Sequence, residues 1–179
     1  MTEDAIRKFD MADERISVPG DSSTEAVYRA LNIVGNKIYI NGLSDDNLQP
    51  DAEFNNILKG IGSKFESEPG GSYNTAVNIM RDFDIDIEKS VDLIFPALHL
   101  AIHNCGVTNI RGIARTAHKE SNRILESTKI LDKLGVEYNL CGNSLRVHSN
   151  NNWLKESYKF NSSLDHRCDM LKVMICLET

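Results

Sequence analysis

The sequence has no long apolar run and little cysteine, proline or aromatic content. Its 179 residues include 4 cysteines, 4 prolines and 1 tryptophan, and aromatic residues make up 7%. No stretch approaches the roughly 18 apolar residues of a membrane-spanning helix, so we expect no membrane association. The first residues, Met1 to Asp4, are acidic and no apolar run follows them. This argues against a secretory signal, and we expect a cytoplasmic protein.

Positive charge is also in deficit. The chain carries 20 Lys and Arg against 26 Asp and Glu, a net charge of −6. This balance argues against nucleic acid or an anionic membrane as the main partner, so any anion site must be a local cluster.

Metal-ligating residues show no recognisable spacing. The cysteines are scattered, with no zinc-finger or redox pair, and are typical of buried thiols in a reducing compartment. They are Cys105, Cys141, Cys168 and Cys176. Four histidines show no convincing ligand set either. They are His99, His103, His118 and His148. We therefore expect no metal site and no cofactor.

What the chain does contain is the mixture of a globular protein, with 41% apolar and 26% charged residues. Its length favours a single domain over residues 1–179, large enough to bury a core without staples, and we expect a monomer.

Apolar periodicity and turn residues predict alternating strands and helices. The expected helices cover residues 1–14, 24–34, 54–61, 90–102, 118–134 and 165–177. The expected strands cover residues 16–18, 37–42, 63–67, 73–80, 107–113, 136–140 and 144–148. The order reads as about two and a half copies of one β-α-β-α-β-β unit. Helices outnumber what one sheet face needs, which favours a layered α+β fold.

The segment from His118 to Leu134 is the most unusual predicted helix. Its expected inner stripe consists of Ile124, Leu125, Thr128, Leu131 and Leu134. Lys119 and Arg123 lie in its first turns, where the helix dipole disfavours cations by up to about 1 kcal/mol each. Being four apart they share a face, and Glu120 can lie between them. The pattern indicates an anion site with an acid or base in reach. A solvated, charged helix start explains it equally well.

Other helix starts have two interpretations as well. The structural interpretation of Asp92 is that its negative charge stabilises the positive end of a helix dipole, and that of Asp165 is that it is an N-cap. Arg167 repeats the unfavourable placement of Arg123. Ser22 and Ser23 read as caps rather than as ligand contacts.

Short motifs in a fixed order carry a family resemblance. Gly112-Ile113-Ala114 precedes Lys119-Glu120-Ser121, with Arg123 four residues after the lysine, and Asp165-His166-Arg167 follows near the end. Segments 19–23, 49–51, 57–62 and 131–136 fit the same order. Together they resemble the 3-phosphoshikimate 1-carboxyvinyltransferase (EPSP synthase) family, including its Lys-Glu-Ser-Asp-Arg and Asp-His-Arg signatures.

The resemblance implies an α+β fold with repeated β-α-β-α-β-β units, as in one domain of that family's inside-out α/β barrel. It covers most of the second of two similar domains, so we expect the first domain and the extreme C-terminal segment to be absent from residues 1–179. The implied reaction moves the enolpyruvyl group of phosphoenolpyruvate to the 5-hydroxyl of shikimate 3-phosphate and releases phosphate, in the shikimate pathway to aromatic amino acids. We expect this chain to be inactive alone.

The resemblance also implies roles for individual residues. Glu120 matches the acid that protonates the enol methylene, and Asp92 matches the carboxylate that orients and helps deprotonate the hydroxyl. Besides Asp92, the implied substrate-binding set contains three cations that match those around phosphoenolpyruvate. It also contains a histidine that either faces the ligand or makes a structural hydrogen bond. These are Lys119, Arg123, Arg167 and His166.

Three departures from the family pattern keep other interpretations open. Asn122 replaces the motif's aspartate, Arg115 stands where asparagine is usual, and Asp169 replaces a small residue. One alternative is a degenerate, non-catalytic member that acts as a binding module. Another is a relative that acts on UDP-N-acetylglucosamine. Residues 155–157 repeat Lys-Glu-Ser, which we interpret as coincidence because no apolar stripe follows.

Overall fold

The computed structural model describes residues 20–43 and 49–179. The expected helix 1–14 and strand 16–18 lie outside the described residues. The helices are α2 (Ser22–Ile33), α3 (Phe54–Gly60), α4 (Ile94–His103), α5 (Arg123–Leu134) and α6 (His166–Glu178). Short 3-10 turns are η1 (Pro50–Glu53), η2 (Val91–Leu93), η3 (Ala114–His118) and η4 (Asn152–Lys155). Over the described ranges, no helix is both long and apolar enough to cross a membrane.

Within the described residues, the strands form one antiparallel sheet of two strands and one mixed sheet of four strands. They are β1 (Phe65–Glu68), β2 (Gly71–Asn74), β3 (Phe83–Asp86), β4 (Gly106–Arg111), β5 (Glu137–Cys141) and β6 (Ser144–Ser149). β1 and β2 make a hairpin. The larger sheet has the order β3-β4-β6-β5, in which only the β3–β4 pair is parallel. The α+β class predicted from the sequence is confirmed.

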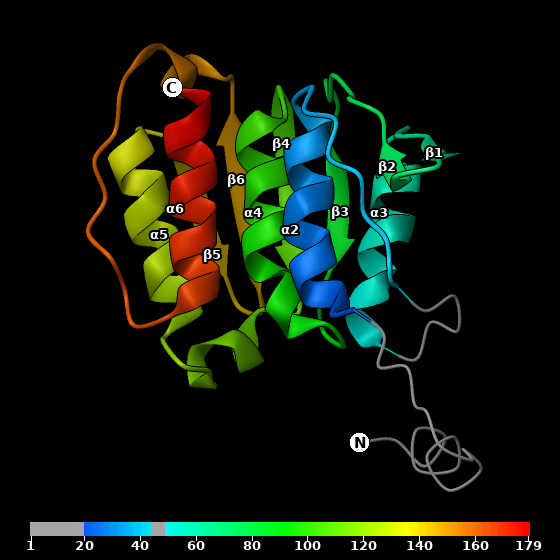
Figure 1. The fold of residues 1–179 in the computed structure, drawn as a ribbon. Helices are drawn as coiled ribbons and strands as arrows, with labels where there is room; N and C mark the ends of the chain where they lie inside the picture. Colours follow the sequence, from blue (N-terminus) through cyan, green and yellow to red (C-terminus); the bar gives the residue numbers. More distant parts are fainter. Residues whose placement is uncertain (1–19, 44–48) are drawn as a thin grey trace, which may run out of the picture.

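α2, α4, α5 and α6 lie side by side over one face of the larger sheet, whereas α3 lies at the β3 edge near the β1–β2 hairpin (Figure 1). α4 contacts β4 and β6, and α2 and α6 both contact α4. All of α4, from Ile94 to His103, is buried, as its nearly unbroken apolar sequence predicts.

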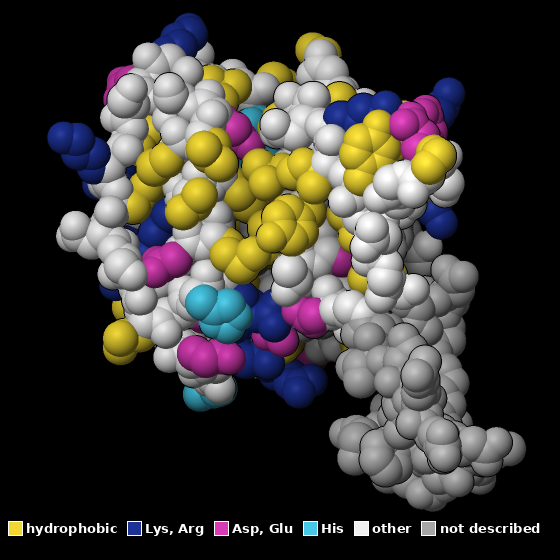
Figure 2. Space-filling view, viewed as in Figure 1, with side chains coloured by type: hydrophobic (Ala, Val, Ile, Leu, Met, Phe, Trp, Pro, Cys, Tyr) yellow, Lys and Arg dark blue, Asp and Glu magenta, His cyan; other side chains and the backbone are white. Residues whose placement is uncertain are grey.

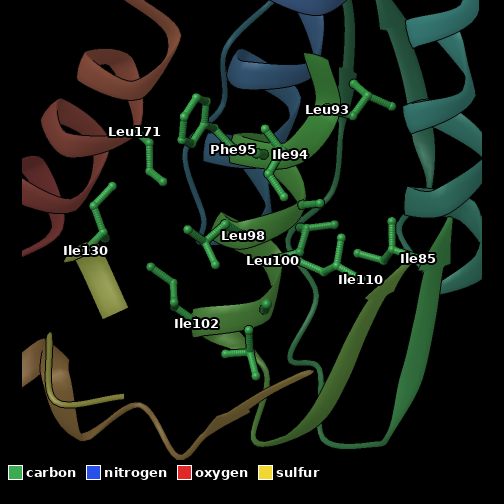
Figure 3. Close-up of a cluster of buried hydrophobic side chains, with 14 of the residues drawn as sticks. Ile85, Leu93, Ile94, Phe95, Leu98, Leu100, Ile102, Ile110, Ile130 and Leu171 are labelled. Atoms are coloured by element: carbon green, nitrogen blue, oxygen red, sulfur yellow. The ribbon is translucent and has the colours of Figure 1, made fainter. Parts of the chain in front are cut away.

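The core is centred on α4. Leu98, Leu100 and Ile102 are fully buried, and they meet Ile110 of β4 and Leu171 of α6. Figure 3 shows these side chains converging from the sheet and the neighbouring helices. The same helix therefore anchors both the sheet and the helical layer.

The predicted repeat is visible in the described residues. One complete unit runs β3-α4-β4-α5-β5-β6, from Phe83 to Ser149. An earlier part of the chain supplies α2, α3, β1 and β2 in the same order. α6 follows the complete unit and lies beside α4 as α2 does.

The strand expected at 37–42 is largely wrong. Only Ile40 forms a bridge, to Ser72. The reason is local: the Asn32 side chain donates to the Ile38 carbonyl oxygen at 3.1 Å and accepts from the Ile38 amide at 2.8 Å. An amide side chain thus replaces the missing strand neighbour.

The strand expected at 73–80 ends early, and β3 was missed. β2 stops at Asn74, and the next strand begins at Phe83. Ile85 and Ile87 are buried there and alternate with exposed Asp84 and Asp86. β3 is an edge strand, and charged outward residues are typical of such edges.

Candidate functional site

The chemically richest end of the molecule is where the parallel strands end and the long helices begin. β3 and β4 are parallel and joined through α4, so their carboxyl ends lie at the same edge. α2, α4, α5 and α6 start at this end, the lower one in Figure 1. Open α/β units bind ligands at such edges, where helix N-termini add positive potential. Figure 2 shows basic, acidic and histidine side chains gathered there.

Gly112 shapes the turn that leaves β4 at this edge. Its φ is +82°, a conformation that favours glycine, and an added Cβ would overlap the backbone of Glu88. The close approach turns the chain into η3, which carries it toward Lys119.

The start of α5 differs from the prediction. The helix begins at Arg123, with Asn122 as its N-cap, whereas Lys119 lies just after η3. Lys119 and Arg123 therefore do not share a helical face. The cap explains the shift, because the Asn122 side chain accepts a hydrogen bond from the Leu125 amide at 3.1 Å.

The inner face of α5 also differs. Leu125 is 50% exposed, whereas Arg123 is fully buried at the first inward position. The buried set is Arg123, Ser127, Thr128, Ile130, Leu131 and Leu134. An arginine thus occupies a core position that lies outside the inner stripe expected from the sequence.

Arg123 is surrounded by carboxylates. Its Nε donates to Asp165 at 2.8 Å, one terminal nitrogen pairs with Asp92, and the other donates to Glu120 at 2.7 Å. Its guanidinium also lies 5.7 Å from the centre of the Phe95 ring. The cation at the positive helix end is therefore compensated by Glu120 of its own segment and by Asp92 and Asp165 of two other segments.

These partners differ in exposure. The side chains of Arg123 and Asp165 are 0% exposed, Asp92 is 25% exposed and Glu120 is 52% exposed. Lys119 is 32% exposed and pairs with Asp92 at 3.1 Å. Solvent exposure thus increases across the site, from buried Asp165 to half-exposed Glu120.

The charges shift one another's ionisation. Burial would raise the pKa of Asp165, but hydrogen bonding and attraction from Arg123 lower it below its ordinary value. The pKa of Asp92 is lowered in the same way, with Arg123 and Lys119 outweighing burial. Both carboxylates therefore stay ionised near neutral pH.

Asp165 does two things at once. As predicted, it is the N-cap of α6, because one oxygen accepts from the Arg167 amide at 3.0 Å. The other oxygen accepts from Arg123 and, at 3.0 Å, from the Ser121 hydroxyl. This second role could not be predicted from the sequence, because the partners are 42 and 44 residues away.

His166 and Arg167 lie in the first turn of α6, at the same end. His166 is exposed and Arg167 is half-buried. Arg167 is close enough to Asp51 and Asp92 to lower the pKa of each by attraction. Asp51, whose pKa burial raises overall, accepts from the Ser23 hydroxyl at 2.5 Å.

The structure thus gathers most of the residues predicted for the site. Asp92, Lys119, Glu120 and Arg123 are linked directly by ion pairs. Arg167 interacts with Asp92 by electrostatic attraction, and His166 lies beside Arg167 in the first turn of α6.

Two departures from the family pattern have local explanations. Asn122 caps α5, a role that asparagine and aspartate fill equally well. Asp169 accepts a hydrogen bond from the Ser163 hydroxyl at 2.8 Å and forms an ion pair with Lys172 at 3.1 Å. These two partners, in α6 and the loop before it, compensate its negative charge. Nothing in the described residues explains the exposed Arg115.

The carboxylates here form no evident metal site. Within residues 20–43 and 49–179, the group of three potential ligands is His99, His103 and Glu178. It lies at the other end of α4.

Comparison with known proteins places the chain among related sequences. The family model described as EPSP synthase (3-phosphoshikimate 1-carboxyvinyltransferase) matches residues 7–178. A 3-phosphoshikimate 1-carboxyvinyltransferase from Aeropyrum pernix is 30% identical over 73% of this chain and 31% of its own length. One from Clostridium kluyveri is 33% identical over 86% of this chain and 35% of its own length. The chain therefore spans about a third of these relatives.

A solved structure supports the fold. An EPSP synthase from Acinetobacter baumannii matches with a TM-score of 0.63 at 18% identity, over 90% of this chain and 40% of the other.

Proposed function

Since this chain belongs to the EPSP synthase family, an enolpyruvyl transferase family, we propose that it forms part of an enzyme that transfers the enolpyruvyl group of phosphoenolpyruvate to the 5-hydroxyl of shikimate 3-phosphate. Phosphate is the other product. Residues 1–179 correspond in this proposal to most of the second domain, and the first domain and a C-terminal segment supply the rest of the cleft. The enzyme acts in the cytoplasm as a monomer.

One observation carries the proposal. Asp92, Lys119, Glu120 and Arg123, which come from two chain segments, meet in one ion-pair network at the strand and helix ends. Cations and carboxylates in alternation suit a substrate with carboxylate and phosphate groups and a reaction that moves protons.

Arg123 would bind the carboxylate of phosphoenolpyruvate through the arm whose partner is most exposed to solvent. Its Nε is held by buried Asp165, while the side chain of its partner Glu120 is 52% exposed. An incoming carboxylate would take the place of Glu120. Lys119 and Arg167 would hold the remaining negative charge, with His166 at the rim.

Displacement frees Glu120 for acid catalysis. Glu120 would protonate the methylene carbon of phosphoenolpyruvate, and the substrate hydroxyl oxygen would bond to the adjacent carbon. The hydroxyl proton passes to Asp92. In the second half, the bond between this carbon and the phosphate oxygen breaks, the methyl group loses a proton to Glu120, and phosphate leaves with the proton from Asp92. Both acids are thereby regenerated.

Asp92 is suited to the hydroxyl. It is 25% exposed, it lies in η2 before α4, and its lowered pKa keeps it ionised. An ionised carboxylate accepts a hydrogen bond from the hydroxyl and orients it.

The test is reconstitution. The chain is combined with a separately produced first domain and the C-terminal segment of a family enzyme, and phosphate release is measured with both substrates. We expect turnover only in the complete mixture. Glu120→Gln should lower kcat by about 10²- to 10⁴-fold while phosphoenolpyruvate still binds.

A matched control comes from the repeated letters at 155–157. Lys155 and Glu156 follow β6, whose end lies away from the ends of β3 and β4 because β6 is antiparallel to β4. Glu156→Gln should leave turnover unchanged. Equal effects of Glu120→Gln and Glu156→Gln, or no turnover in the complete mixture, would contradict the proposal.

A non-catalytic binding module is the second candidate. The observation favouring it is that all donor arms of Arg123 are already engaged by carboxylates. It predicts phosphoenolpyruvate binding without phosphate release in the same reconstituted mixture.

A further inference from the structure

A second polar cluster lies at the far end of α4 from Arg123. His99 and His103 are four residues apart, so both rings project from one face of the helix. Their ring centroids are 4.5 Å apart. Two histidines at this spacing are how helices commonly present two imidazoles to one metal ion.

Glu178 completes the cluster from α6. One of its carboxylate oxygens lies 2.8 Å from His99 Nε2, and the other lies 2.9 Å from His103 Nε2. One potential ligand atom from each residue lies within 4.8 Å of the others. α4 and α6 run in the same direction and end at the upper side of Figure 1, which brings Glu178 to this position.

The cluster is not explained by packing. The side chain of His99 is 0% exposed, and those of His103 and Glu178 are 8% and 9% exposed. Among the described atoms, His99 Nδ1 is buried with no hydrogen-bond partner. Apolar side chains would join these two helices without the cost of burying an imidazole pair and a carboxylate.

We propose that His99, His103 and Glu178 bind a divalent transition metal ion, of which Zn²⁺ is the best match. Two imidazoles and one carboxylate are a donor set that Zn²⁺ uses. Ligands on a tetrahedral ion with bonds of 2.0–2.1 Å lie ~3.3 Å apart. The present nitrogen–oxygen distances of 2.8 and 2.9 Å must therefore open by about half an ångström, which a rotation of Glu178 provides.

The fourth ligand is water. His99 and His103 are buried, and Glu178 is intermediate in exposure at the end of α6, so solvent reaches the cluster from the Glu178 side. The bound ion ties the last turn of α6 to α4. This structural role is independent of the enolpyruvyl transfer proposed above.

The experiment uses the full chain carrying Cys176→Ser, which removes an exposed thiol two residues before Glu178. After chelator treatment, Co²⁺ is added and the visible spectrum is recorded. Zn²⁺ then competes for the site. We expect one ion per chain, with weak ligand-field bands and no thiolate charge-transfer band. Zinc at ~100 times its Kd should raise Tm by ~5–10 °C.

Variants separate the cluster from other histidines. Glu178→Gln and His103→Gln should each weaken binding by more than the ~10- to 100-fold cost of losing an outer-shell partner. His118→Gln, which removes an exposed histidine elsewhere, should bind as the parent does. If His103→Gln fails to fold, Glu178→Gln at the helix end decides. No Co²⁺ binding by the parent, or equal binding by Glu178→Gln, overturns the proposal.

Discussion

Arg123 is the residue on which the site end of the molecule depends most. It holds the beginnings of α4, α5 and α6 together through Asp92 and Asp165. From the sequence, its position at a helix start is electrostatically unfavourable, and for that reason we expected an anion site there. Its burial was not foreseeable, because the compensating acids lie 31 and 42 residues away.

Removing Arg123 should therefore be costly. Arg123→Gln leaves Asp165 buried without its cation, and we expect it to lower the free energy of unfolding by ~3–5 kcal/mol. Urea denaturation at pH 7 measures the change. Lys119→Gln, at a partly exposed ion pair, serves as the control and should cost no more than ~1 kcal/mol. Similar urea midpoints for the two variants would show that the buried network is not stabilising.

Asn122 allows a finer test of a family departure. Because asparagine and aspartate cap helices about equally well, Asn122→Asp should change stability by less than ~0.5 kcal/mol, whereas Asn122→Ala should cost ~1 kcal/mol. Thermal unfolding of both variants checks the pair. A large loss in Asn122→Asp would mean that the substitution matters for more than the cap.

At the scale of elements, the sequence predicted the helices better than the strands. α5 carries an apolar stripe, α4 is apolar almost throughout, and Asp165 caps α6 as predicted. The expected caps Ser22 and Ser23 are wrong, because Asp21 caps α2 and both serines lie inside the helix. The strand at 37–42 failed because a side chain, Asn32, satisfies its backbone. β3 was missed although Phe83, Ile85 and Ile87 alternate with aspartates, a signal that a stricter search for period-two alternation would have found.

The link between α5 and α6 should be sensitive to acid. Since Asp165 has a lowered pKa in the folded protein, the stability it contributes is complete above its unfolded pKa of ~3.9 and is lost as pH falls through the folded value. The difference in unfolding free energy between wild type and Asp165→Asn, expected to be ~2–4 kcal/mol at pH 7, should narrow below about pH 4.

Denaturant titrations at a series of pH values measure this difference. Exposed Asp132→Asn is the control and should not show the narrowing. A difference that stays constant down to pH 2 would contradict the assigned role of the Asp165 charge.

The turn after β4 makes a separate prediction. Gly112→Ala places a side chain at φ +82° and against the backbone of Glu88, so we expect a loss of at least ~2 kcal/mol. Gly142, whose φ is +57° with open space around it, is the matched control for the dihedral alone. If Gly142→Ala costs as much as Gly112→Ala in urea denaturation, the close approach to Glu88 is unimportant.

At the scale of the whole molecule, the repeats share one core. Repeat proteins often unfold unit by unit, because each unit touches only its neighbours. Here α4 contacts α2, α6 and the sheet, so elements of different units are buried against one helix. The repeat order was readable from the sequence, but this shared packing was not, since it depends on how the units stack.

Shared packing predicts a single unfolding transition, which is also the test of residues 1–179 as one domain. Leu98 is fully buried in α4, and Leu98→Ala should cost ~3 kcal/mol.

The one tryptophan, Trp153, is 3% exposed and donates to the Ile102 carbonyl oxygen at 2.9 Å, so its fluorescence reports on the end of α4. Far-UV circular dichroism reports on all helices, and amide exchange in α2 reports on the neighbouring unit. Because α2 packs on α4, all three signals should move together by the same free energy. A shift of the Trp153 transition that leaves α2 exchange unchanged would mean that the units unfold separately and that α4 does not unite them.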